Sequence, residues 1–391
     1  MKTLIEIHVI QNFAPSNLNR DDTGAPKDAL FGGTRRARIS SQCQKRTIRQ
    51  FFNSIVGKGL LLQEDFAIRT KRLLRAIVLL LIDQGRSEQE AITKTRLALA
   101  AVGLPVKEDG KNEYLLFLGQ RETRDIARII HEKWDLIAES PAEPDTPSET
   151  TKKRRKTKED AVKSADPELK NAFMTVINGG KAVDIALFGR MLADMPEKNQ
   201  DAACQVAHAI STHTVDREFD YFTAIDDLKP DDNAGADMIN TVEFNSACFY
   251  KYAVVDLNKL VENLHGDKDL ALKGLRVFLE GFVVAEPTGK QNSFAAHNPP
   301  EFVAVSVRCE AAPRSFTNAF EVAIRTRKEE SLTGKSVEAL VKKAVMLKTA
   351  FEGDDKNTFV LNLTEVDARG LGSYVKSLKE LLDAVIKVVR E

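Results

Sequence analysis

The chain has 391 residues, a length that predicts roughly two or three globular units. Its 57 basic and 57 acidic residues give no net charge, so a nucleic-acid-binding protein of this composition must gather its positive charge locally. The four cysteines (Cys43, Cys204, Cys248, Cys309) form no CxxC pair, which argues against a zinc ribbon and a disulfide framework and predicts a cytoplasmic protein. The longest apolar run covers only residues 76–82, which is too short for a membrane span. We expect no metal or other cofactor.

The chain begins with a predicted strand and a basic stretch. Residues 3–10 alternate β-branched and other side chains, which predicts a half-buried strand. Residues 19–52 then combine glycine-containing backbone with a high density of cations. The cations are Arg20, Lys27, Arg35, Arg36, Arg38, Lys45, Arg46 and Arg49.

This basic stretch ends in a predicted amphipathic helix. The sequence Ser41-Gln42-Cys43-Gln44 is typical of a capping box that starts a helix. Helical spacing then places an apolar set on one face and a polar, cationic set on the other. The apolar set is Thr47, Ile48, Phe51 and Phe52, and the polar set is Gln42, Lys45, Arg46 and Arg49. A cationic face beside a helix N-terminus predicts a cradle for a run of phosphates, with a merely solvated basic face as the alternative.

The middle of the chain differs from the first part in amino-acid composition. Residues 59–140 are dense in helix-forming apolar residues and predict an inserted helical subdomain. Residues 141–167 are rich in Pro, Ser and Thr and predict a disordered loop. This loop contains a cationic tract, Lys152, Lys153, Arg154, Arg155, Lys156 and Lys158. The tract is either a solubilising tether or a sequence-independent contact with duplex DNA.

The second half alternates strands and helices. Strands are expected at residues 183–191, 241–255, 302–307 and 359–363. Helices are expected at residues 202–210, 271–284, 315–323, 336–347 and 375–389. An acidic, aromatic excursion from the core is expected at residues 219–237. This order predicts an α+β fold with a ferredoxin-like sheet that carries large insertions.

No motif compels catalysis. His213 with Asp216 could form a general acid–base pair, but a hydrogen-bonded structural histidine is the commoner arrangement. No HExxH zinc motif, complete phosphate loop or RNP1 aromatic signature is present. The main alternative to a binding protein is a metal-independent RNA-processing endoribonuclease that uses His213 or His8. A third hypothesis is an assembly scaffold that does not touch RNA.

Several separated blocks, taken in order, resemble one family. They are IHVI (7–10), LNRDD (18–22), KDALFGGTRRARISSQ (27–42), VDIALFGRM (183–191), AHAISTH (207–213) with VD (215–216), and the patterns at 220–228 and 243–253. Together they resemble the CasC family, the backbone subunits of the type I-E CRISPR surveillance complex Cascade. The loop at 141–167 lies outside this resemblance.

The resemblance implies a hand-shaped subunit. A modified RRM-type palm would comprise residues 1–58, 181–206 and 241–391, with helical fingers at 59–180 and a thumb at 207–240. Copies would stack head to tail along CRISPR RNA, together with other Cascade subunits, and would support hybridisation of target DNA to that RNA.

The resemblance also implies the RNA contacts, position by position. The palm contacts would be Arg20, Lys27, Ser40, Gln42, Lys45, Arg46 and Arg49. Met191 and Thr212 occupy positions that look like a wedge that splays a base and the partner of that wedge.

Overall fold

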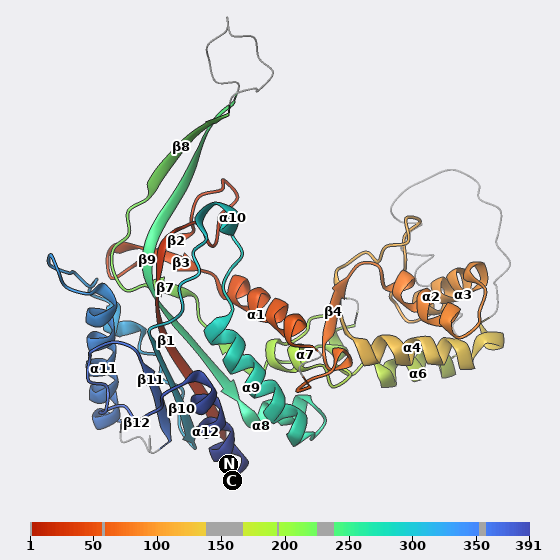
Figure 1. Cartoon of the computed structure of the whole chain (residues 1–391). Helices are drawn as coiled ribbons and strands as arrows, with labels where there is room; N and C mark the ends of the chain where they lie inside the picture. Colours follow the sequence, from red (N-terminus) through yellow and green to blue (C-terminus); the bar gives the residue numbers. More distant parts are fainter. Residues whose placement is uncertain (1, 57–58, 138–166, 194, 225–237, 352–356) are drawn as a thin grey trace, which may run out of the picture. The chain divides into compact units, whose positions relative to one another are not determined.

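The computed structural model describes residues 2–56, 59–137, 167–193, 195–224, 238–351 and 357–391 (Figure 1). The chain divides into two compact units. Unit 1 comprises Met1–Ile55, Cys204–Asn258 and Leu272–Glu391, and unit 2 comprises Val56–Ala203 and Lys259–Ala271. Unit 2 starts near the expected start of the helical insertion. It also takes in residues 181–203 and 259–271, which were expected to belong to the palm.

Unit 1 is built on a large mixed sheet (Figure 1). Its strands are β1 (Thr3–Ser16), β2 (Asp28–Phe31), β3 (Thr34–Ile39), β6 (Cys204–Val206), β7 (Ala209–Ser211), β8 (Glu218–Ala224), β9 (Met238–Asp256), β10 (Phe302–Cys309), β11 (Thr358–Asn362) and β12 (Ser373–Tyr374). The strand order is β12-β11-β10-β1-β9-β7-β3-β2, and β6 and β8 also pair with β9. Only the β11–β12 pair is parallel among the pairings of these strands.

Four strands form the centre of this sheet in the order β10-β1-β9-β7, with antiparallel neighbours throughout. Helix α1 (Ser41–Ile55) lies between β1 and β7 in the sequence, and α9 (Lys268–Val284) lies between β9 and β10. Because β1 is flanked on both edges, Ile7 pairs with Val305 on one side and Ala253 on the other. Strand β1 was expected to be half-buried, but its first eleven residues are almost all buried.

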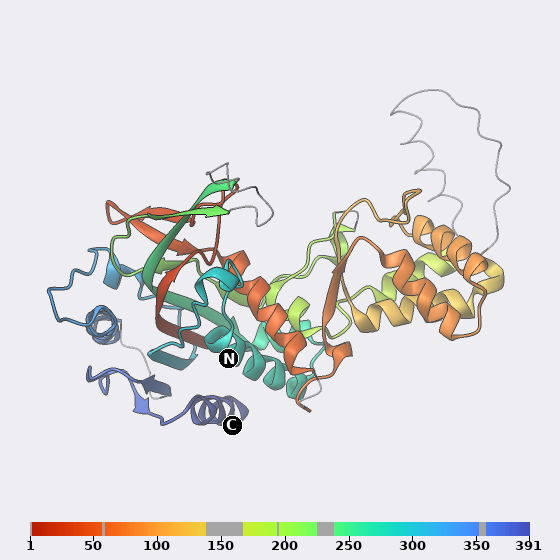
Figure 2. The ribbon, with the colours of Figure 1, turned by 45° about the horizontal axis from the view of Figure 1, so that its top comes forward.

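Helices cover both faces of this sheet (Figures 1 and 2). Helix α11 (Leu332–Ala350) and η4 (Thr317–Phe320) pack on one face, where Leu340 and Phe320 join a core with Tyr250 and Phe302. On the other face α1 lies beside α9, and a Cβ atom at Gly281 would approach the Phe51 ring to 2.8 Å. The remaining helices of unit 1 are α10 (Gln291–Phe294) and α12 (Leu378–Arg390).

Arg36 is fully buried, although the sequence placed it in a surface-basic stretch. Its guanidinium donates to the carbonyl oxygens of Ser211 (3.1 Å), Phe320 (2.9 Å) and Glu321 (3.2 Å). Burial lowers the pKa of Arg36 from its usual value. Arg36 therefore does not contribute to a surface contact, and instead ties β3 to β7 and to the end of η4.

Strands β8 and β9 form a long hairpin that extends beyond the other strands of unit 1 (Figure 1). The register runs from Glu218 opposite Phe244 to Ala224 opposite Met238. Every residue of β8 is exposed, including Phe219 and Tyr221. Residues 225–237, which contain most of the expected acidic excursion, lie outside the described residues.

The described part of unit 2 is mainly helical, with one two-stranded sheet. Its elements are η1 (Gln63–Asp65), β4 (Ala67–Thr70), α2 (Leu73–Asp83), α3 (Glu88–Ala101), β5 (Leu116–Gly119), α4 (Gln120–Glu132), η2 (Trp134–Leu136), α6 (Pro167–Val176), α7 (Val183–Phe188) and η3 (Pro196–Lys198). Helix α8 (Leu257–Asn263) contains residues of both units. The helices bury a core that includes Ile77, Leu99, Ile130 and Phe173. Helices α2, α3 and α4 lie within the stretch 59–140 that was expected to be rich in helix.

Three predicted elements were wrong. Residues 183–188 form helix α7 rather than a strand, because a short, fully buried apolar run shows no periodicity that separates the two. Residues 204–206 and 209–211 are strands rather than a helix, because pairing with β9 overrides the helix propensity of alanine. The helix expected at 315–323 is only the short 3-10 turn η4. The remaining strands and helices of the second half are confirmed, with boundaries that differ by a few residues.

Candidate nucleic-acid interface

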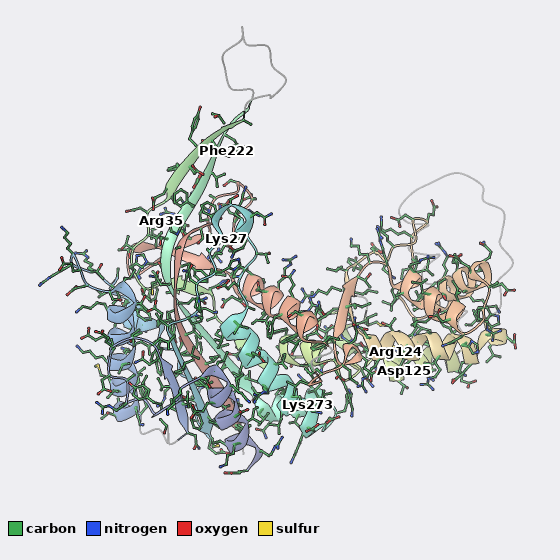
Figure 3. The ribbon with its side chains drawn as sticks, viewed as in Figure 1. Lys27, Arg35, Arg124, Asp125, Phe222 and Lys273 are labelled. Carbon is green, nitrogen blue, oxygen red and sulfur yellow. The ribbon has the colours of Figure 1, made fainter. Side chains whose placement is uncertain are left out.

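The loop between Asn19 and Lys27 is folded onto the junction between β3 and α1. The Lys27 N–H donates to the Asn19 carbonyl at 2.8 Å, and the Asn19 side-chain oxygen accepts from the Ser40 N–H at 2.8 Å. The Arg38 N–H donates to the Lys27 carbonyl at 2.9 Å. These bonds bring Lys27 and the neighbour of Asn19, Arg20, to the start of α1. Figure 3 shows Lys27 and Arg35 near the base of the β8–β9 hairpin.

The loop itself is held in one conformation by two polar side chains. The Asp21 carboxylate accepts from the N–H groups of Thr23 (2.9 Å) and Ala25 (3.0 Å), and the Thr23 hydroxyl bond is the largest contribution that lowers the Asp21 pKa. The amide of buried Asn17 donates to the carbonyls of Gly24 (3.0 Å) and Glu243 (2.8 Å). The loop that carries Arg20 and Lys27 is therefore tied to β9.

Helix α1 begins differently from the predicted capping box. Ser40, not Ser41, caps the helix, because its Oγ accepts from the Cys43 N–H at 3.2 Å. Gln44 is buried and donates instead to the Ala207 carbonyl at 2.8 Å. Ser40 is 6% exposed, so this predicted contact residue mainly shapes the N-terminus of the helix.

The two faces predicted for α1 are confirmed. Thr47, Ile48 and Phe52 are buried, whereas Gln42 and Arg46 are exposed. Lys45 and Arg49 are half-buried on the polar face. The helix therefore presents its predicted cations on the side that does not pack on the sheet.

His208 lies beside the N-terminus of α1, close to several cations. Its Nδ1 accepts from the Ser41 N–H at 3.1 Å and lies 3.4 Å from the Arg38 guanidinium. Burial, with added repulsion from Arg38 and Lys27, lowers the pKa of His208. The imidazole is consequently neutral at neutral pH. The positive charge near the start of α1 comes instead from Arg38, Lys27 and the cations of α1, which are Lys45, Arg46 and Arg49.

The structure buries Thr212, the predicted partner of the wedge. Its side chain is 0% exposed, and its hydroxyl oxygen accepts from Ser336 on α11 at 2.8 Å. Its carbonyl accepts from the Ile324 N–H at 3.0 Å. Thr212 therefore holds the end of β7 against α11 and presents no surface to RNA in this chain.

The two histidines of the nuclease hypothesis are both engaged in the fold. His213 Nε2 accepts from the Cys248 N–H at 3.2 Å and its Nδ1 lies 2.9 Å from the Thr214 carbonyl, so the ring extends the hydrogen bonding of β9. His8 is 1% exposed and stacks on Phe316, and burial lowers its pKa to about 3. Both ring nitrogens of His213 therefore lie at hydrogen-bonding distance from backbone groups, and His8 is enclosed in the core.

Met191 lies in unit 2 and is 79% exposed. The backbone beside it is rigidly held, because Arg190 and Gln200 exchange two N–H···O bonds of 2.9 Å. The Arg190 guanidinium is itself buried and bonds both carboxylate oxygens of Glu122, at 2.8 and 2.9 Å. Met191 is thus a large apolar side chain presented to solvent from a fixed backbone.

The predicted DNA contact lies outside the described residues, and one set of exposed side chains had no predicted role. Lys152, Lys153, Arg154, Arg155 and Lys156 lie outside the described residues. The exposed aromatic side chains of β8 (Phe219, Tyr221 and Phe222) received no role from the sequence. Their alternation with Glu218 and Asp220 is the sequence pattern that could have predicted an exposed strand here.

The part of the chain that the structure describes contains no group of three or more His, Cys, Asp or Glu side chains able to hold a metal ion. Its helices include none that is both long and apolar enough to cross a membrane.

Comparison with known proteins identifies the family. Two chains from solved structures are similar to this one over 98% of its length and 99% of their own. One comes from a structure described as a CRISPR RNA-guided surveillance complex, pre-nicking, with 30% sequence identity and a TM-score of 0.80. The other comes from a CRISPR RNA-guided surveillance complex, with 26% identity and a TM-score of 0.70. A search of curated proteins finds no match. A family model described as CT1975-like protein matches residues 5–386, and the chain therefore belongs to the CT1975-like protein family.

Proposed function

We propose that the chain is a sequence-independent CRISPR RNA-binding backbone subunit of a type I-E Cascade complex. The observation that carries this proposal is the gathering of Arg20, Lys27 and the α1 cations at one helix N-terminus, through the bonds of Asn19. Its context is a chain similar along nearly its whole length to chains of CRISPR RNA-guided surveillance complexes.

The fold supports an RNA-holding palm. The order β10-β1-β9-β7, with α1 and α9 as crossover helices, is the order of a ferredoxin-like sheet. In this proposal unit 1 is the palm, the helices of unit 2 are the fingers and the β8–β9 hairpin is the thumb. The cationic loop and helix contact the sugar–phosphate backbone.

Backbone contacts suit the task because they carry no sequence information. A subunit that coats a guide must accept any spacer and leave sequence recognition to base pairing with the target DNA. The cations proposed for this contact are Arg20, Lys27, Lys45, Arg46 and Arg49, with Gln42 as a neutral hydrogen-bonding group and Ser40 as the cap.

In the proposed assembly, copies bind head to tail along the RNA. A heterologous contact that does not close on itself generates an open helical filament. Met191 of one copy would act as an apolar wedge that unstacks a base, and splaying at intervals leaves the intervening bases available for pairing. Thr212 keeps a supporting role, since its hydroxyl is buried against Ser336.

The remaining parts of the proposal concern partners. The tract Lys152–Arg155 with Lys156 is the candidate contact with target DNA, and other Cascade subunits complete the complex in the cytoplasm. We propose no catalytic activity and no cofactor. Purified protein incubated with its RNA should leave the RNA intact, and cleavage that His213→Ala abolishes would instead support the endoribonuclease hypothesis.

The test is a charge reversal on α1. Lys45→Glu combined with Arg49→Glu should abolish co-purification of RNA while the protein remains folded, because two phosphate contacts become repulsive. The matched control is Lys379→Glu with Lys387→Glu on α12, where both lysines are exposed. RNA that co-purifies at the wild-type ratio with the α1 variant would show that the palm assignment is wrong.

A further inference from the structure

A polar groove lies beside the loop of Asn19–Lys27, on the side of β9. Its volume is about 420 Å³, and its walls come from that loop, from the beginning of β9 and from the turn before α10. The side chains that matter for its chemistry are Arg20, Thr23, Asn240, Thr241, Glu243 and Lys290. Lys290 is the member of this set that lies farthest from the basic stretch in the sequence.

The walls of the groove are held by tertiary contacts. The Asn17 amide joins the Gly24 carbonyl to the Glu243 carbonyl, which fixes the loop against β9. A Cβ atom at Gly289 would lie 2.3 Å from the Leu18 carbonyl oxygen, so only glycine allows the turn before α10 to pack there. The groove is therefore formed before any ligand arrives.

The turn that carries Lys290 is similarly constrained. The Gln291 side chain donates to the carbonyls of Pro287 (3.1 Å) and Ala296 (3.2 Å) and accepts from the Ala296 N–H (2.8 Å). Lys290 itself has left-handed backbone, with φ of 53°. The bonds of Gln291 therefore hold Lys290 in a backbone conformation that non-glycine residues rarely adopt.

The lining favours an anionic, hydroxyl-bearing ligand. Arg20 and Lys290 are exposed cations at the groove. The Glu243 carboxylate is paired with Arg217 at 3.0 Å, which offsets its negative charge. Asn240, Thr23 and Thr241 add hydrogen-bonding groups. The volume falls within the ordinary range of small-ligand sites, of roughly 300–1,000 Å³.

We propose that this groove binds one nucleotide of the single-stranded RNA, with Arg20 and Lys290 at its phosphate. The inference rests on the proposed function and extends the RNA contact from α1 to the turn before α10. Arginine offers a planar fork to phosphate oxygens and lysine a point charge, so the pair can hold one phosphate from two sides. Lys290 is thereby an RNA-binding residue.

The test is Lys290→Asn, measured by fluorescence anisotropy with a labelled oligouridine RNA at a series of salt concentrations. Asparagine removes the charge and tolerates left-handed backbone, so the turn keeps its shape. Affinity should fall about tenfold, as for a lost charge-assisted hydrogen bond. The slope of log affinity against log salt should shrink by about 0.7, as expected for one phosphate on a single strand.

The control is Lys328→Asn, which removes an exposed lysine of unit 1 that does not line the groove. It should bind like wild type, and Lys290→Arg should retain most of the affinity. The inference is overturned if Lys290→Asn matches wild type in both affinity and salt slope.

The α1 double variant separates this inference from the proposed function. If Lys45→Glu with Arg49→Glu abolishes RNA binding while Lys290→Asn keeps the wild-type RNA affinity, the proposed function stands and the groove assignment fails. If only Lys290→Asn loses binding, the groove assignment stands and the α1 assignment fails. Wild-type protein that binds no RNA overturns both.

Discussion

The ion pair beneath Met191 gives the sharpest stability prediction. Glu122 and Arg190 are buried, with side chains 0% and 1% exposed. The Glu122 carboxylate accepts from Arg190 at 2.8 and 2.9 Å, and also from the N–H groups of Gly119 (2.6 Å) and Gly179 (2.7 Å). Glu122→Gln removes the charge and turns one acceptor into a donor that faces other donors.

The magnitude follows from what the substitution leaves behind. Glutamine leaves the buried Arg190 charge without an anion and with only neutral acceptors such as the Lys198 carbonyl (3.1 and 3.3 Å), which costs about 4 kcal/mol. For a unit of this size, such a loss lowers the melting temperature by about 10 °C. Unit 2 should also open more readily around the backbone pairing of Arg190 with Gln200.

Calorimetry of the full chain and hydrogen exchange at residues 189–200 measure these two effects. The control is Arg124→Gln on the same helix (Figure 3), because Arg124 is 53% exposed and its ion pair with Glu64 is worth about 1 kcal/mol at most. In the double variant of Glu122→Gln and Arg190→Gln, the two losses should overlap by about 2 kcal/mol rather than add. The reasoning is refuted if Glu122→Gln melts with the same profile as Arg124→Gln.

Three further predictions concern unit 1 and Met191. Arg36→Met should destabilise unit 1 by about 3 kcal/mol in urea unfolding, because the carbonyls of Ser211, Phe320 and Glu321 lose their buried donor; unfolding at the wild-type midpoint would contradict this. His8 stays neutral in the fold, because burial is the main cause that lowers its pKa to about 3. Its contribution to the free energy of unfolding is therefore fully present above pH ~6.5 and is lost as the pH falls from there towards 3, by up to about 5 kcal/mol. His8→Gln should therefore show a flatter dependence of unfolding free energy on pH across that window, and an unchanged slope would exclude His8 as the cause. Met191→Ala should retain RNA binding but change the periodic nuclease protection of the bound RNA, and an identical footprint would argue against the wedge.

The sequence alone predicted the elements whose signal is local. The two faces of α1 follow from helical spacing between residues 42 and 52, and β9 follows from a long β-branched and aromatic run. The cations of the candidate interface were predicted from the same stretch. Such features are readable because each depends on residues within a few turns of one another.

The tertiary structure decided what depends on distant neighbours. Residues 204–206 are a strand only because β9 lies beside them, and Arg36 is buried only because the segment at 320–321 covers it. Lys290 joins Arg20 at one groove through contacts of Gly289 with Leu18, far apart in the chain. Hydrophobic periodicity and charge can be read from residues that are close together in the sequence. Burial, strand pairing and the partner of each polar group depend instead on which remote segments fold together.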